Sequence, residues 1–169
     1  MKHTRAIAIR RAQPADIEVL VGFSASMARE TEGRELDPQR LRAGTQSVFD
    51  DPARGFYLVA EVGGALRGAV VGQLMITFEW SDWRNATFWW IQSVYVSPDW
   101  RRQGVYRQLH QAVLKEARQN PQVCGVRLYV ERENHVAQSV YSRVGMTQTR
   151  YQVFEEDFVL SGPPGASRG

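Results

Sequence analysis

One stretch of the chain, residues 91–109, joins a strand pattern to a helix pattern through a short basic turn. Apolar and β-branched residues run through Val96, Pro98 stops the strand, and helical spacing begins near Arg102. A strand that passes directly into a helix is typical of folds in which a sheet and helices pack in layers. The stretch therefore predicts an α/β fold with this turn at the end of a strand.

The turn itself has the properties of a phosphate-binding site. The N-terminus of a helix carries backbone N–H groups without helical partners and a partial positive charge, both of which favour a bound phosphate. Arg101 and Arg102 add fixed positive charge, and Gly104 removes a side chain where the backbone would approach a ligand. Charged residues and glycines also collect in solvated connections, so these residues alone leave both interpretations open.

The other elements follow in an order that one mixed sheet accommodates. Strands are expected at residues 5–11, 56–62, 66–78, 88–96, 126–130 and 148–160, and helices at residues 14–30, 37–50, 102–119 and 134–144. The glycines at 63 and 64 predict a hairpin turn. Gly68 and Gly72 indicate a bulge or a close backbone approach.

Length and composition restrict the classes of function. A chain of 169 residues with 43% apolar and 23% charged residues fits one globular domain over residues 1–160, followed by a disordered tail over residues 161–169. No membrane-spanning run and no signal-peptide pattern is present, so a cytoplasmic location without membrane association is expected. The arginines behind the net charge of +3 are spread among 18 acidic residues, which does not favour nucleic-acid binding.

The cysteine and the histidines do not indicate a metal or a nucleophile. Cys124 stands between valine and glycine and is expected to be a small buried apolar residue. His3, His110 and His135 are scattered without the spacing of metal ligands, so no metal is expected.

Arg101 and Gly104 resemble the first part of the acyl-CoA signature of the GNAT acetyltransferases, Gln/Arg-x-x-Gly-x-Gly/Ala, in which Tyr106 takes the place of the last small residue. We expect Tyr106 to crowd the pyrophosphate. The resemblance implies that strand backbone binds the pantetheine arm of acetyl-CoA and that turn amides bind its pyrophosphate. The implied residues are Val94, Tyr95, Val96, Arg101, Arg102, Gln103, Gly104, Val105, Tyr106 and Arg107.

Residues 129–146 resemble the second GNAT motif, with Asn134 after a strand, Ala137 three residues later, and Tyr141 four residues before Gly145. Asn134 and Tyr141 are seven residues apart and share one face of a helix, so one long ligand could touch both. As isolated residues they would be an N-cap and a core tyrosine. Two motifs in the right order favour the functional interpretation.

The resemblance covers nearly the whole chain and implies a fold and a reaction. The implied fold has the order β-α-α-β-β-β-α-β-α-β, with a mixed, mostly antiparallel twisted sheet flanked by about four helices. The implied reaction is transfer of an acetyl group from acetyl-CoA to a primary amine by direct attack in a ternary complex. A catalytically silent acyl-CoA-binding sensor or recruitment module is the alternative. Neither a P-loop nor a Gly-x-Gly-x-x-Gly motif is present, which argues against other nucleotide binders.

The same resemblance implies catalytic roles. Tyr141 would protonate the leaving thiolate, and the backbone N–H of Val94 would stabilise the oxyanion. A glutamate base is absent from the strand positions where GNAT enzymes commonly carry it. The base is therefore expected to be Glu79 directly, or a water ordered by Gln92 or Ser93.

The acceptor is expected to be a cationic small molecule, with a peptide amine also considered. Carboxylates attract an ammonium group, and indole faces add a cation–π contact of about 0.5–2 kcal/mol. The implied acceptor residues are Glu30, Trp80, Asp82, Trp83 and Trp89. The tryptophans could equally be a packed core or a dimer surface, and a homodimer through the sheet edge or the last strand is a further expectation.

Overall fold

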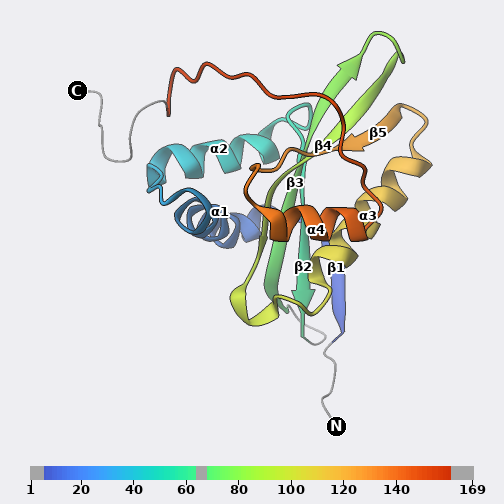
Figure 1. Ribbon diagram of the computed structural model, residues 1–169. Coiled ribbons are helices and arrows are strands. Elements are labelled where there is room, and N and C mark those ends of the chain that lie inside the picture. The colour runs from blue at the N-terminus through green and yellow to red at the C-terminus, as the bar shows by residue number, and fades with distance from the viewer. Residues whose placement is uncertain (1–5, 64–67, 161–169) are drawn as a thin grey trace.

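The computed structural model describes residues 6–63 and 68–160, and within them five strands form one sheet (Figure 1). The strands are β1 (Ile7–Arg11), β2 (Phe56–Val62), β3 (Ala69–Ser81), β4 (Ala86–Val96) and β5 (Val123–Arg127). The helices are α1 (Ile17–Glu32), α2 (Pro38–Asp50), α3 (Val105–Gln119) and α4 (His135–Arg143), with 3-10 turns η1 (Pro14–Asp16) and η2 (Pro98–Trp100).

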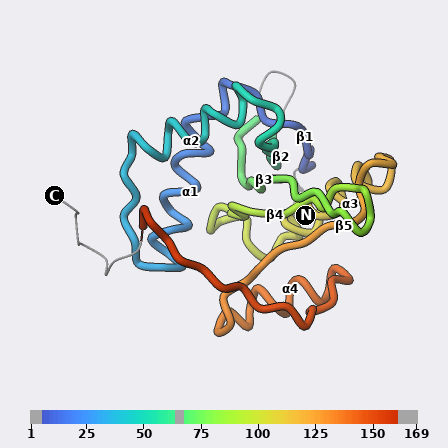
Figure 2. The backbone as a smooth tube through the Cα atoms, turned by 90° about the horizontal axis from the view of Figure 1, so that it is seen from above, coloured from blue at the N-terminus to red at the C-terminus, as the bar shows by residue number. Residues whose placement is uncertain are grey.

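The sheet is mixed, as predicted. Strands β1 to β4 are antiparallel neighbours, and β5 pairs with β4 in parallel. Figure 2 shows α1 and α2 on one face and α3 on the other. Both faces are therefore buried, which explains the nearly continuous apolar runs of β2 and β3.

Two apolar clusters fill the space between the sheet and its helices. On one face, Leu58 and Ile76 pack with Leu109 and Val113 of α3. On the other face, Tyr57 and Val59 pack with Leu20 of α1. Because side chains alternate along a strand, neighbouring residues of β2 pack into the clusters on opposite faces of the sheet. This two-sided core fixes α1 and α3 against the sheet.

Strands β4 and β5 separate before β4 ends. Their pairing runs from Thr87 and Val123 to Trp90 and Arg127, whereas β4 continues to Val96. Among the described residues, the second half of β4 therefore has no strand on its β5 side. An extended backbone without a partner strand leaves a place where a ligand can bind along its edge.

The prediction of a last strand over residues 148–160 is wrong. This segment leaves α4 and runs toward α1 and α2 (Figures 1 and 2), where the Leu160 carbonyl accepts a hydrogen bond of 2.6 Å from Arg34 Nη1. Phe154 is 91% exposed. Alternating apolar residues favour extended backbone, but a strand also needs a neighbour to pair with, and this segment pairs with no strand among the described residues.

Other boundaries differ in smaller ways. Helix α3 begins three residues later than predicted, because Arg102 and Gly104 have φ of +60° and +79° and cannot continue a right-handed helix. Strand β5 ends at Arg127, before the predicted residue 130. The bulge expected near Gly72 is confirmed, since Ala60 of β2 faces Gly72 whereas Glu61 faces Val70, which leaves one extra residue in β3.

The remaining expectations about the fold concern Cys124, membrane-spanning helices, the turn at 63 and 64, and the C-terminal tail. Cys124 is half-buried in β5. No described helix has the length and apolar character needed to cross a bilayer. Part of the predicted turn at 63 and 64 and the expected tail over residues 161–169 lie outside the described residues.

Candidate active site

The connection from β4 to α3 ends in a helix N-terminus that the described side chains leave uncapped. The Ser97 amide bonds the Val71 carbonyl at 2.9 Å, which anchors the start of the turn to β3. Gly104 is the N-cap residue, and the Gln108 amide makes the first bond into the helix, at 3.1 Å from the Gly104 carbonyl. The amides of residues 105–107 precede that bond and have no helical acceptor.

A glycine is needed at position 104 because of the backbone conformation there, and not because neighbouring atoms would clash with a side chain. A Cβ at this position would meet no atom of the described chain within 4 Å, so the space in front of the helix is open. A φ of +79° is disfavoured for any residue with a Cβ. The open space and the uncapped amides together fit a diphosphate.

Arg101 does not point its charge at this space. Its Nη2 bonds Glu30 Oε2 of α1 at 2.6 Å, and its Nε bonds the Val96 carbonyl at 2.9 Å. The Tyr95 hydroxyl also donates to Glu30, at 2.8 Å. Hydrogen bonds from Tyr95 and then Arg101 lower the pKa of Glu30. Arg101, Tyr95 and Glu30 thus tie the turn to α1, and Arg102 stays exposed.

A bulge interrupts β4 just before the turn. Gln73 of β3 faces Tyr95, but Met75 faces Gln92, so β4 holds one extra residue between these pairs. Ser93 has φ of +50°, a left-handed conformation that is uncommon outside glycine. The bulge lies in the part of β4 that β5 no longer accompanies and changes the direction of the backbone at Val94.

Helix α4 carries the second motif. Asn134 is its N-cap, and its Oδ1 accepts a hydrogen bond of 3.0 Å from the Ala137 amide. One function of Asn134 is therefore the capping role that an isolated asparagine would have. Tyr141 is partly buried, and this burial raises the pKa of its hydroxyl, which is thus protonated at neutral pH.

The sequence matches the model of the acetyltransferase (GNAT) family over residues 23–146, which is most of the chain. The chain belongs to the GNAT family. A solved structure of a possible acetyltransferase from Clostridium difficile 630 is 38% identical, with 90% of this chain and 98% of that chain covered and a TM-score of 0.83. No curated protein matches the chain.

Two more distant structures share the GNAT fold. An aminoglycoside N-acetyltransferase in complex with CoA is 16% identical, with 94% of this chain and 99% of that chain covered and a TM-score of 0.72. A predicted acetyltransferase from Clostridium acetobutylicum, solved with acetyl-CoA, is 16% identical, with 89% and 96% covered and a TM-score of 0.70.

A cavity of about 340 Å³ at the point where β5 leaves β4 is the candidate acceptor site of this GNAT domain. It is lined by Thr77, Phe78, Glu79, Trp90, Gln92, Tyr129 and Val153. Glu79 accepts hydrogen bonds from Trp90 Nε1 at 2.5 Å and from Arg127 Nη1 at 3.0 Å. Both carboxylate oxygens are engaged, so Glu79 is a poorer direct base than the sequence indicated.

The structure separates the other expected acceptor residues from this cavity. Trp80, Asp82 and Trp83 lie at the tip of the β3–β4 hairpin, where Trp83 is 86% exposed and the Asp82 carboxylate bonds the Trp83 amide at 2.9 Å. Trp89 is 6% exposed and packs edge-on against Phe56, so it is a core residue, as the alternative interpretation held. Glu30 belongs to the network with Arg101.

The ring of Tyr106 lies between α3 and α4. It contacts Tyr141 and His110, with ring centroids 5.6 Å and 5.8 Å away. Within the described chain, the buried Tyr106 hydroxyl has no hydrogen-bond partner. Tyr106 is thus directed toward α4 and joins the two GNAT motifs.

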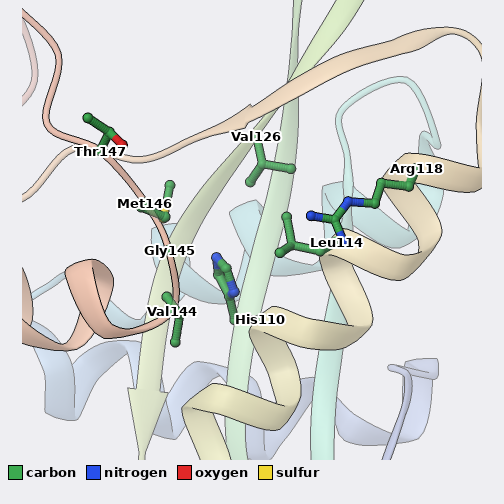
Figure 3. Close-up of a pocket in the computed structure, with 8 residues that line it drawn as sticks. All are labelled: His110, Leu114, Arg118, Val126, Val144, Gly145, Met146 and Thr147. Carbon is green, nitrogen blue, oxygen red and sulfur yellow. The ribbon is translucent and has the colours of Figure 1, made fainter.

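His110 borders a second cavity, of about 350 Å³, between α3 and the segment after α4 (Figure 3). It is 1% exposed, and its Nε2 has no partner among the described residues. Burial and then the charge of Arg118 lower the pKa of His110, so it is neutral at pH 7. No three described His, Cys, Asp or Glu residues are arranged to hold a metal ion.

Several residues in or near the candidate site were not predicted from the sequence. Gln73 is polar within the apolar run of β3, and this isolated polarity was the available signal. His110 follows Tyr106 by four residues and therefore shares its helix face. Arg127 gave no signal, because its pairing with Glu79 joins residues 48 positions apart.

Proposed function

We propose that this GNAT protein is an N-acetyltransferase that moves the acetyl group of acetyl-CoA to a primary amine by direct attack in a ternary complex. The observation that carries the proposal is that an uncapped, open helix N-terminus follows a β4 edge that β5 leaves free. These two features suit the two ends of acetyl-CoA. The free edge takes the pantetheine arm, and the helix N-terminus takes the diphosphate.

The diphosphate binds to the backbone amides of residues 105–107, with the exposed guanidinium of Arg102 as a cation beside them. The helix dipole favours the negative charge at this end. Arg101 acts indirectly, because its bonds to Glu30 and to the Val96 carbonyl hold the turn in place. The pantetheine arm lies along residues 91–96, and Asn134 contacts it through the amide nitrogen that capping leaves unused.

Acetyl transfer needs a donor for the oxyanion and a proton for the sulfur. As the amine nitrogen bonds to the thioester carbon, the carbonyl oxygen gains negative charge, which the Val94 N–H stabilises. When the carbon–sulfur bond breaks, the thiolate takes the proton of the Tyr141 hydroxyl, which water then restores. The buried position of Tyr141 keeps this proton in place until it is needed.

The amine also loses a proton during the attack. We assign its removal to a water at Gln92, because both oxygens of Glu79 already accept hydrogen bonds. The Gln92 side-chain nitrogen Nε2 donates a hydrogen bond to Thr77 Oγ1 at 2.6 Å. The Oε1 oxygen of the same side-chain amide therefore points away from Thr77. That oxygen is the acceptor for the water.

The acceptor is a cationic small molecule with a primary amine. The support is the cavity at β4, where the Glu79 carboxylate lies beside the rings of Trp90 and Tyr129, whose centroids are 6.0 Å apart. A carboxylate and aromatic faces suit an ammonium group. Arg127 neutralises part of the charge of Glu79, so an acceptor amine must compete with this pair.

An acetyl-transfer screen tests the proposal. Release of the CoA thiol from acetyl-CoA is followed with polyamines, aminoglycosides, amino acids and peptide N-termini. Amine-dependent release, with the acetylated amine detected by mass spectrometry, supports the enzyme. Binding of acetyl-CoA without release on any amine supports the silent acyl-CoA-binding module instead.

A further inference from the structure

Gln73 is a polar residue in the core at the point where β4 changes direction. It is 0% exposed, and it lies on β3 next to the position opposite the bulge. A buried side-chain amide lowers stability unless hydrogen bonds replace its contacts with water. The partners of Gln73 therefore indicate why a polar residue stands here.

Its amide nitrogen has two partners. Gln73 Nε2 donates to Ser24 Oγ of α1 at 3.1 Å and to the Ser93 carbonyl of the bulge at 3.2 Å. Ser24 is itself buried. The amide thus links α1, β3 and the bulge through one NH₂ group.

The Ser93 contact controls the orientation of the next peptide unit. The Ser93 carbonyl and the Val94 N–H belong to the same planar trans peptide, so they point in opposite directions. Holding the carbonyl toward Gln73 of β3 directs the Val94 N–H away from β3. That side is where β5 has ended and where the thioester is proposed to lie.

The geometry points to Gln73 as a positioning residue for acetyl transfer, which rests on the proposed function. Its amide holds Ser93 at φ of +50° and thereby aims the Val94 N–H at the developing oxyanion. Residues other than glycine keep such a conformation only when their surroundings hold it. Gln73 supplies that hold from the core.

Packing alone does not explain the residue. Gln73 Oε1 is buried without a hydrogen-bond partner in the part of the chain that the structure describes. A methionine would occupy a similar volume without an orphaned oxygen. Buried polar atoms without hydrogen-bond partners occur mainly at positions where function requires them.

Gln73→Met tests the inference, with Ser24→Ala as the matched control. The methionine removes the donor to Ser93, whereas the alanine removes only the other partner of the same NH₂ group. For Gln73→Met we expect kcat to fall about 10- to 100-fold, since a displaced oxyanion donor acts in the transition state. KM for acetyl-CoA and the melting temperature should stay near the wild-type values. Ser24→Ala should keep kcat within about 2-fold, because the Ser93 bond is retained.

The second readout does not depend on activity. Backbone couplings and carbon shifts measured by NMR report the φ of Ser93 in wild type and in both variants. A positive φ in wild type and in Ser24→Ala, lost in Gln73→Met, is the expected result. A positive φ retained in Gln73→Met, or kcat that falls only in step with the folded fraction, would overturn the role of Gln73. Wild-type protein that shows the expected φ but releases no thiol would instead refute the proposed function.

Discussion

Tyr106 of α3 and Tyr141 of α4 meet edge to face, with ring centroids 5.6 Å apart and an interplanar angle of 67°. The pair brings the residue that departs from the first GNAT motif against the proposed general acid of the second. Tyr106 therefore supports Tyr141 from α3, and the ring contact fixes one side of the acid. An edge-to-face pair of this kind stabilises by about 0.5–1.5 kcal/mol beyond its buried area.

Removing the Tyr141 hydroxyl should affect chemistry more than binding. For Tyr141→Phe we expect kcat to fall about 100-fold or more, because general acid catalysis contributes at least that much. The dissociation constant for acetyl-CoA should change little, since the ring and its contact with Tyr106 are kept. Steady-state kinetics and calorimetry measure the two quantities separately. An unchanged kcat would remove Tyr141 from the mechanism.

Alkaline pH should destabilise the fold through the buried phenols. Burial, and then the charge of Tyr141, raise the pKa of Tyr106, and burial raises the pKa of Tyr141. Above about pH 10 the unfolded chain releases phenolic protons that the folded chain keeps, so the free energy of unfolding falls as pH rises. In urea unfolding between neutral and alkaline pH, the free energy of unfolding should fall less steeply with pH for Tyr106→Phe than for the wild type. Tyr151→Phe, which removes an exposed phenol, is the matched control, and equal slopes for Tyr106→Phe and wild type would contradict the prediction.

Substitutions of two acidic residues in the same hairpin should have different effects on KM for the acceptor amine. Glu79 lines the cavity, whereas Asp82 lies at the tip and bonds the Trp83 amide. Glu79→Gln should raise KM for a cationic amine about 10-fold, in line with the loss of a charged hydrogen-bond partner. Asp82→Asn should leave KM unchanged. Equal effects of the two variants on KM would move the acceptor away from the cavity.

Alanine substitutions at two glycines should change the free energy of unfolding in opposite directions. Gly104 has φ of +79°, so Gly104→Ala should lower the free energy of unfolding by about 1–2 kcal/mol and weaken acetyl-CoA binding. Gly44 is exposed within α2 and has open space around it, so Gly44→Ala should raise stability by about 0.5–1 kcal/mol. Urea unfolding measures both. A neutral Gly104→Ala would show that the turn does not depend on its left-handed residue.

Local signals predicted the parts of the site that one short stretch contains. The passage from β4 through Pro98 to α3 and the capping position of Asn134 follow from residue order and propensity. The binding of Arg101 to Glu30 did not, because it joins residues 71 positions apart that meet only after α1 packs on the sheet. The position of Trp89 depends on which face of β4 the core covers, and composition alone does not decide that. The wrong last strand has the same origin, since pairing depends on the path of the chain after α4.

The proposed function requires that main-chain amides at the start of α3 bind the diphosphate of coenzyme A. Calorimetric titration of the wild-type protein with CoA and, in parallel, with pantetheine tests it most directly, because pantetheine lacks the diphosphate and the nucleoside. We expect one CoA bound per chain, with pantetheine bound more weakly by about 100-fold or more, because pantetheine lacks several charge-assisted hydrogen bonds. Equal affinity for the two ligands, or no heat with CoA, would contradict it.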